Sequence, residues 1–181
     1  MRKRSGTTDL MPRATAIHLR SVTSLVLALL GNLAHAAPTD AQVKAAYLIN
    51  FTRYVAWPTT AGHQICLVGA DDIADWLERS QAKSGLMVRR LLEPTEIEGC
   101  TLLFLGRDST QVRNWLAARH DRAILTVSEQ GGFLQKGGII NLIYQSNSLR
   151  FEVNLDNARQ SHLQVSSRLL ALAEHVEGNS Q

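Results

Sequence analysis

Two cysteines, Cys66 and Cys100, are the residues of this sequence with the most evident chemistry. They are not arranged as Cys-x-x-Cys, the spacing typical of redox centres. In an oxidising compartment an even cysteine count indicates a structural disulfide first. Such a bridge would close a loop of about 35 residues and contribute roughly 3.5 to 4 kcal/mol in the chain-entropy model. A redox switch or a reactive thiol remains the alternative.

The other polar residues form no recognisable catalytic or metal-binding motif. The sequence contains neither G-x-S-x-G nor H-E-x-x-H, and the pairs Asp71-Asp72 and Glu96-Glu98 are typical of helix caps and loop charges. A lone histidine is more often structural or exposed than catalytic, and four histidines show no zinc-ligand spacing with the cysteines. They are His63, His120, His162 and His175. We therefore predict a protein that is not an enzyme and that holds no metal or cofactor.

Two glycine turns, at residues 69–72 and 106–109, follow strand-like runs and precede helical ones. Open α/β sheets bind ligands where such turns meet. Neither turn is a G-x-G-x-x-G or a P-loop, however, and the acidic residues in both would repel a phosphate group. Ordinary helix capping is the preferred interpretation, with nucleotide binding as the alternative.

The first 36 residues have the pattern of a secretory signal. Five basic residues precede or flank an uncharged run that ends in Ala34-His35-Ala36, a small-x-small cleavage pattern. The apolar run is shorter than the roughly 20 residues that span a bilayer. We predict cleavage after Ala36, from a start at Met1 or Met11, and a periplasmic protein.

Removal of the signal changes the charge balance. Residues 37–181 keep 14 basic and 15 acidic residues, a formal charge of about −1. Nucleic-acid binding needs clustered Lys and Arg, which this part of the chain lacks. The remaining 145 residues are enough for one domain with a single core.

Apolar runs and capped helical patterns alternate along the middle of the chain. The predicted strands are 62–69, 86–92, 100–106 and 122–127, and the predicted helices are 71–81 and 108–120. This alternation implies right-handed parallel crossovers. The runs 137–144 and 149–155, joined by a short polar turn, predict a hairpin. Apolar residues at helical spacing predict a last helix near 161–177; they are Val165, Leu169, Leu172 and Val176.

We therefore predict a single three-layer α/β domain over residues 37–181. Its central sheet is largely parallel and flanked by helices, and it ends in an antiparallel hairpin and a terminal helix. No internal repeat and no low-complexity linker is present.

The first predicted helix carries the most informative side chains. Thr39 and Gln42 fit a capping box, and Pro58 is expected to end the helix. Its aromatic residues predict core packing against the sheet. Polar residues one turn away also allow a notch lined by aromatic rings, in which a ligand or a partner residue could bind. The candidate contacts on this stretch are Asn50, Arg53, Tyr54 and Trp57.

Further candidate contacts come from the C-terminal part. Arg150 and Arg168 could bind an anionic or carboxylate-bearing partner, although solvated charge is the simpler interpretation of each alone. Leu169 and Leu172 belong either to the core or to a partner surface that combines the last helix with the exposed side of the first.

The order of these pieces resembles the YfiR-type periplasmic proteins. The matching segments are V-K-A-A-Y-L-I-N-F-T-R-Y-V-A-W-P (43–58), I-C-L-V-G (65–69), C-T-L-L-F-L-G (100–106), I-L-T-V-S (124–128), G-G-I-I-N-L (137–142), R-F-E-V-N-L-D-N-A (150–158) and S-S-R-L-L-A-L-A (166–173). The combination of N-F-x-x-Y-V-x-W-P with G-G-x-I-N and R-F-x-x-N is the most specific part.

The resemblance implies a non-catalytic repressor. It would bind the periplasmic sensor domain of an inner-membrane diguanylate cyclase and lower cyclic di-GMP output, be sequestered by an outer-membrane lipoprotein, and form a homodimer. It also supports the Cys66–Cys100 disulfide. Better-known members have a second cysteine pair near the G-G-x-I-N strand, and this sequence has none there. The alternative is a periplasmic small-molecule-binding module that signals to another membrane receptor.

Overall fold

The computed structural model describes residues 37–58 and 62–178, with the backbone alone for 81–84. Residues Pro38–Gln181 cluster as one compact unit, and the account below concerns that unit. The predicted signal peptide, residues 1–36, lies outside the described residues. Within those residues no helix is both long and apolar enough to cross a membrane.

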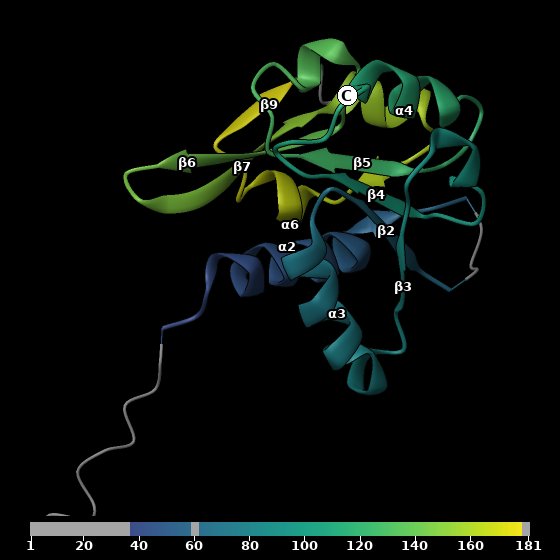
Figure 1. Cartoon of the computed structure of the whole chain (residues 1–181). Coiled ribbons are helices and arrows are strands. Elements are labelled where there is room, and N and C mark those ends of the chain that lie inside the picture. Colours follow the sequence, from purple (N-terminus) through teal and green to yellow (C-terminus); the bar gives the residue numbers. More distant parts are fainter. Residues whose placement is uncertain (1–36, 59–61, 179–181) are drawn as a thin grey trace, which may run out of the picture. The chain divides into compact units, whose positions relative to one another are not determined.

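A seven-stranded mixed sheet forms the centre of the unit (Figure 1). Its strands, in spatial order, are β3 (Met87–Arg90), β2 (Gln64–Val68), β4 (Leu102–Leu105), β5 (Leu125–Ser128), β6 (Ile140–Gln145), β7 (Ser148–Asn154) and β9 (His175–Glu177). All neighbours are parallel except β6 and β7, which form the predicted hairpin. The prediction of a largely parallel α/β sheet with an antiparallel hairpin is confirmed.

Two apolar cores lie on the two faces of the sheet, because successive strand residues point to opposite sides. In β4, Leu102 and Phe104 enter the core between the sheet and the helices α2 (Asp40–Tyr54) and α3 (Asp71–Ser84). Leu103 and Leu105 enter the core beneath α4 (Val112–Ala118). Figure 1 shows α4 above the sheet and α2 and α3 below it, so the predicted three layers are present.

The first helix begins as predicted and ends earlier. The Thr39 hydroxyl accepts from the Gln42 N–H, and the Gln42 side chain accepts from the Thr39 N–H. The helix stops at Tyr54, not next to Pro58, because Val55 and Ala56 (β1) pair with Gln164–Val165 (β8) in an antiparallel ribbon. This pairing moves Trp57 off the helix.

The helix predicted at 108–120 is shorter than expected. It begins at Val112, behind Gln111 in a left-handed conformation. Ser109 does not cap it, because its hydroxyl donates instead to the Val68 carbonyl oxygen (2.8 Å).

The predicted terminal helix at 161–177 is wrong. The segment instead contains β8, the one-turn helix α6 (Ser167–Leu170) and β9, and it is preceded by α5 (Leu155–Gln160). The Ser166 hydroxyl accepts from the Leu169 N–H and starts α6, whereas the Glu174 N–H donates to Phe151 and draws the chain into the sheet. The apolar spacing that suggested one helix is therefore shared among a strand, a helical turn, an exposed turn and another strand.

Candidate functional site

A largely apolar groove with a volume of about 550 Å³ lies between α2, β7 and α6. We call it the α2 groove. Its lining residues are Pro38, Gln42, Val43, Ala46, Tyr47, Asn50, Phe51, Tyr54, Arg150, Phe151, Leu169 and Leu172.

Three aromatic rings form the floor of the α2 groove. Tyr47, Phe51 and Phe151 meet edge to face, with ring centroids 5.3 to 5.9 Å apart. The spacing of one helical turn brings Tyr47 and Phe51 to the same side of α2. The Tyr47 hydroxyl donates to the Leu149 carbonyl oxygen (2.9 Å), which fixes α2 against the hairpin. The floor is therefore rigid and apolar.

The rim of the groove is exposed and mixed in character. The Leu172 side chain is 67% exposed and Tyr54 is 37% exposed, and both are large apolar residues. Asn50 and Arg150 are exposed beside them. Within the described residues, no hydrogen bond or ion pair holds the Arg150 guanidinium. A partner with apolar side chains and a carboxylate would complement this rim.

Five of the eight candidate contacts from the sequence line the α2 groove: Asn50, Tyr54, Arg150, Leu169 and Leu172. Leu169 is buried at 3% exposure, so it belongs to the floor and to the core. The sequence did not identify Phe151 as a lining residue, because its alternation in β7 indicated only a core position.

The other three candidates lie elsewhere. The Trp57 indole N–H donates to the Thr101 carbonyl oxygen (3.2 Å), and its ring lies 4.6 Å from that of His63. Arg53 lines two smaller cavities of about 280 and 340 Å³ on neighbouring faces of α2. Arg168 is exposed on α6.

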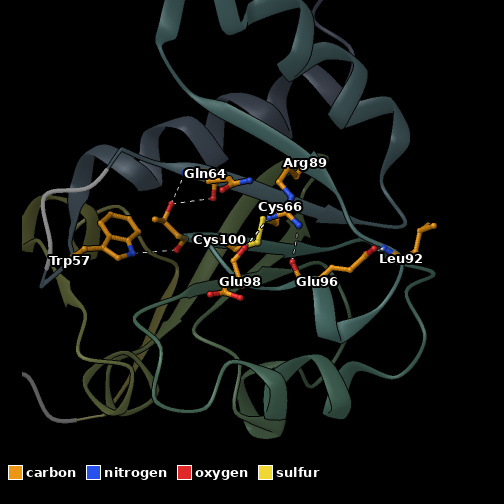
Figure 2. Close-up of a disulfide and its surroundings, with 9 residues drawn as sticks. Trp57, Gln64, Cys66, Arg89, Leu92, Glu96, Glu98 and Cys100 are labelled. Atoms are coloured by element: carbon orange, nitrogen blue, oxygen red, sulfur yellow. Dashed lines mark hydrogen bonds between the residues drawn. A yellow bond between two sulfur atoms is a disulfide. The ribbon is translucent and has the colours of Figure 1, made fainter.

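Cys66 and Cys100 form a disulfide with Cα atoms 5.8 Å apart (Figure 2). Cys66 lies in β2, and Cys100 lies two residues before the start of the neighbouring strand β4. Both are buried in the core beneath α4, at 0% and 6% exposure. The Arg89 guanidinium donates to the carbonyl oxygens of Glu96 and Glu98, and so holds the loop that leads to Cys100. This burial favours the structural interpretation over a reactive thiol.

An ionic cluster that the sequence analysis missed joins α2 to the end of β5. The Lys44 ammonium lies 2.7 Å from carboxylate oxygens of both Asp40 and Glu129, and Arg107 lies 3.1 Å from Glu129. Burial lowers the pKa of Lys44, but hydrogen bonds to Asp40 and Glu129 outweigh it and raise that pKa above its ordinary value. Burial raises the pKa of Glu129, and hydrogen bonds from Lys44 and Arg107 outweigh it in turn and lower that pKa.

Asn154 and Asn157, in the segment R-F-E-V-N-L-D-N-A, have structural roles. The Asn154 side chain accepts from the Asn157 N–H to start α5 and donates to Glu177 in β9. The Asn157 amide donates to the carbonyl oxygens of Leu134 and Gly138. A Cβ atom on Gly138 would lie 2.2 Å from the Phe133 ring. Asn154, Asn157 and Gly138 therefore maintain the fold and do not line the α2 groove, whereas the motif residue Asn50 does line it.

The two glycine turns leave no room for a phosphate group between them. The Gly106 N–H donates to the Val68 carbonyl oxygen (2.9 Å). A Cβ atom on Gly106 would lie 2.1 Å from the Gly69 carbonyl oxygen, so the two backbones are in direct contact. The geometry supports packing, not nucleotide binding.

Comparisons with known proteins agree with this fold. The family model described as YfiR/HmsC-like matches residues 41–174. Among solved structures, one titled as a conserved domain protein from Vibrio cholerae O1 biovar El Tor str. N16961 is similar, with a TM-score of 0.58 and 12% sequence identity. The match covers 77% of this chain and 60% of that one, and at 12% identity it supports the fold alone.

Proposed function

The chain belongs to the YfiR/HmsC-like family, and from that premise we propose that it represses an inner-membrane diguanylate cyclase by binding its periplasmic sensor domain. Membership supports a periplasmic regulatory role in general. The specific partner, the lowering of cyclic di-GMP output, a homodimeric state and release by an outer-membrane lipoprotein belong to the proposal.

The observation that carries the proposal is the α2 groove with its exposed rim. Large apolar side chains gathered around a hollow, here Leu172 and Tyr54, are typical of a surface that another molecule covers. Aromatic and aliphatic anchors in a rigid pocket, with Arg at the edge, are typical of the centre of a protein interface. The groove has the aromatic floor and, in Arg150, the Arg at its edge.

Repression through such a groove needs no catalytic residue. A binder that prefers the inactive arrangement of a transmembrane dimer shifts the population towards that arrangement by its differential affinity for the two states. Roughly tenfold preferential binding corresponds to about 1.4 kcal/mol, which a few buried apolar side chains can supply.

One observation favours the alternative of a small-molecule module. Arg53 is exposed and lines both of the smaller cavities, one with Tyr54, Gln164 and Ser166 and the other with Thr52 and His63. An anionic ligand could bind there. Two results together would support this alternative. Small carboxylates would raise the melting temperature of the purified protein but not that of Arg53→Ala, and loss of the gene would leave the cyclic di-GMP level of the cells unchanged.

The first test measures intracellular cyclic di-GMP in cells that lack the gene. We expect the level to rise, and the exported protein, but not a form without residues 1–36, to restore it. Leu172→Glu is expected to abolish the restoration. Leu92→Glu is the matched control, because Leu92 is also a large apolar residue, 84% exposed, that does not line the groove.

The result decides between distinct conclusions. An unchanged cyclic di-GMP level, in cells shown to express an inner-membrane diguanylate cyclase, would refute repression. Restoration by both Leu variants would keep repression but move the binding surface away from the α2 groove.

A further inference from the structure

Strand β6 continues past the end of its neighbour β5. The β5–β6 pairing stops at Ser128–Asn141, whereas the β6–β7 pairing continues to Gln145–Ser148. In Figure 1 the β6–β7 hairpin extends beyond the other strands on the left of the view. The stretch Leu142–Gln145 therefore has a partner strand on one side only.

The phase of the hairpin shows where the free peptide groups point. In an antiparallel pair, every second residue directs its N–H and C=O away from the partner strand. In β7 these residues are Leu149 and Phe151, since the Leu149 carbonyl accepts from Tyr47 and the Phe151 carbonyl from the Glu174 N–H. The residues opposite them are Tyr144 and Leu142, which therefore face the β5 side. Because the Ser128–Asn141 pairing still engages the Leu142 N–H, the open groups begin with the Leu142 carbonyl and the Tyr144 peptide.

The two edges of this hairpin differ in protection. The β7 edge is covered by the Tyr47 hydroxyl and the Glu174 backbone. On the β6 edge, no described loop donates a backbone hydrogen bond to Tyr144 or accepts one from it. Exposed edges are normally blocked by Pro, Lys or a bulge, and Ile143, Tyr144 and Gln145 provide none of these.

A cavity of about 580 Å³ lies along the open edge. One wall is β6 from Asn141 to Tyr144, and the other comes from Arg107 and residues 129–131. Glu129 binds one arm of the Arg107 guanidinium, whose side chain remains 64% exposed. Tyr144 is half exposed above the buried Lys44, with the ammonium 5.9 Å from its ring centroid.

We propose that the open edge of β6 accepts an extended segment of a partner protein as an additional strand that continues the line of β5. Peptide groups at strand spacing are matched by another strand, which supplies main-chain hydrogen bonds while side-chain pockets supply selectivity. The remaining donors of Arg107 would contact a carboxylate of that segment. This surface is separate from the α2 groove, because the groove is lined by β7 and the open edge belongs to β6.

The test selects binders from a displayed library of random peptides on the purified full-length, disulfide-bonded protein. We expect peptides rich in β-branched and acidic residues that protect the Tyr144 amide from hydrogen exchange. Tyr144→Pro should weaken their binding roughly tenfold, because it removes the amide donor. Tyr144→Ala is the matched variant that keeps the amide, and Arg107→Glu should weaken the acidic peptides.

Tyr144→Pro should leave the hairpin intact, because the Tyr144 N–H is not used by β7. Exchange at Phe151 and the melting temperature check this. If Tyr144→Pro unfolds, two measurements still test the proposal: hydrogen exchange at the Tyr144 amide of the unchanged protein with and without peptide, and peptide binding by Arg107→Glu. Peptides that bind without protecting Tyr144 would overturn the proposal. A second result would also overturn it. If the Tyr144 amide is already protected without peptide, and the protein is a dimer that Tyr144→Pro dissociates, then a second copy of the chain occupies the edge.

Discussion

Lys44 and Glu129 lie 85 residues apart in the sequence, yet the Lys44 Nζ and Glu129 Oε2 atoms are 2.7 Å apart and each side chain is 7% exposed. This buried pair connects the first turns of α2 to the carboxyl end of β5. Removing one member of a buried pair leaves the other charge poorly solvated, so its energetic effect is much larger than that of a surface pair.

We therefore expect Glu129→Gln to lower the free energy of unfolding by about 3 kcal/mol, at the lower end of the range for buried pairs because Asp40 still binds Lys44. Chemical denaturation measures this. Asp75→Asn, which removes a partner of Arg90 from an exposed ion pair, is the control and should have an effect of less than about 1 kcal/mol. Equal effects of the two variants would argue against a stabilising role for the buried pair.

The same carboxylate predicts a pH dependence. The pKa of Glu129 is lowered in the folded protein from its ordinary value of 4.5. Its contribution is therefore complete above pH 4.5 and is lost as the pH falls through the lower folded value. Denaturation at a series of pH values should show a smaller acid destabilisation in Glu129→Gln than in the unchanged protein. Parallel curves for the two proteins would contradict this assignment.

Leu169 and Leu172 should respond differently to truncation although they are three residues apart. Leu169 is buried at 3% exposure, so Leu169→Ala should cost about 2 to 5 kcal/mol of unfolding free energy. Leu172 is 67% exposed, so Leu172→Ala should change it by less than about 0.5 kcal/mol. Thermal denaturation of the two variants checks this, and a large loss in Leu172→Ala would place that side chain in the core.

Removal of the disulfide should destabilise the protein without changing its fold. Cys66 and Cys100 are 34 residues apart, and the double Cys→Ala variant should lose roughly 3.5 to 4 kcal/mol if the chain-entropy model holds. Urea denaturation of this variant, compared with the unchanged protein before and after reduction, measures the loss. If the oxidised and reduced proteins are equally stable, the bridge does not stabilise the fold.

The sequence predicted the parts of the fold that depend on local chemistry. The capping box at Thr39, the alternation in β7 and the apolar runs of β2 and β4 each have a period or a cap that specifies the element. It failed at Val55 and at residues 161–177, because there the backbone pairs with distant segments, β8 in one case and β7 in the other. Local spacing contains no information about such partners.

In the candidate site, too, local patterns were predictable from the sequence and contacts between distant segments were not. Residue type and spacing were enough to nominate Asn50, Tyr54, Arg150, Leu169 and Leu172. Their assembly into one groove depends on how the hairpin packs on α2. Asp40 and Lys44 are four residues apart on a helix and could have been identified as a pair. Glu129 could not, since nothing local connects it to α2.

The walls of the α2 groove come from segments that are far apart in the order of synthesis and export. Residues 38–54 supply one wall, and residues 150–172 supply the other. A nascent chain that has delivered only its first hundred or so residues into a compartment therefore has half of the surface and no partner for β1. The proposed binding through the groove would therefore begin only when folding is nearly complete. A partly exported chain would not repress the partner.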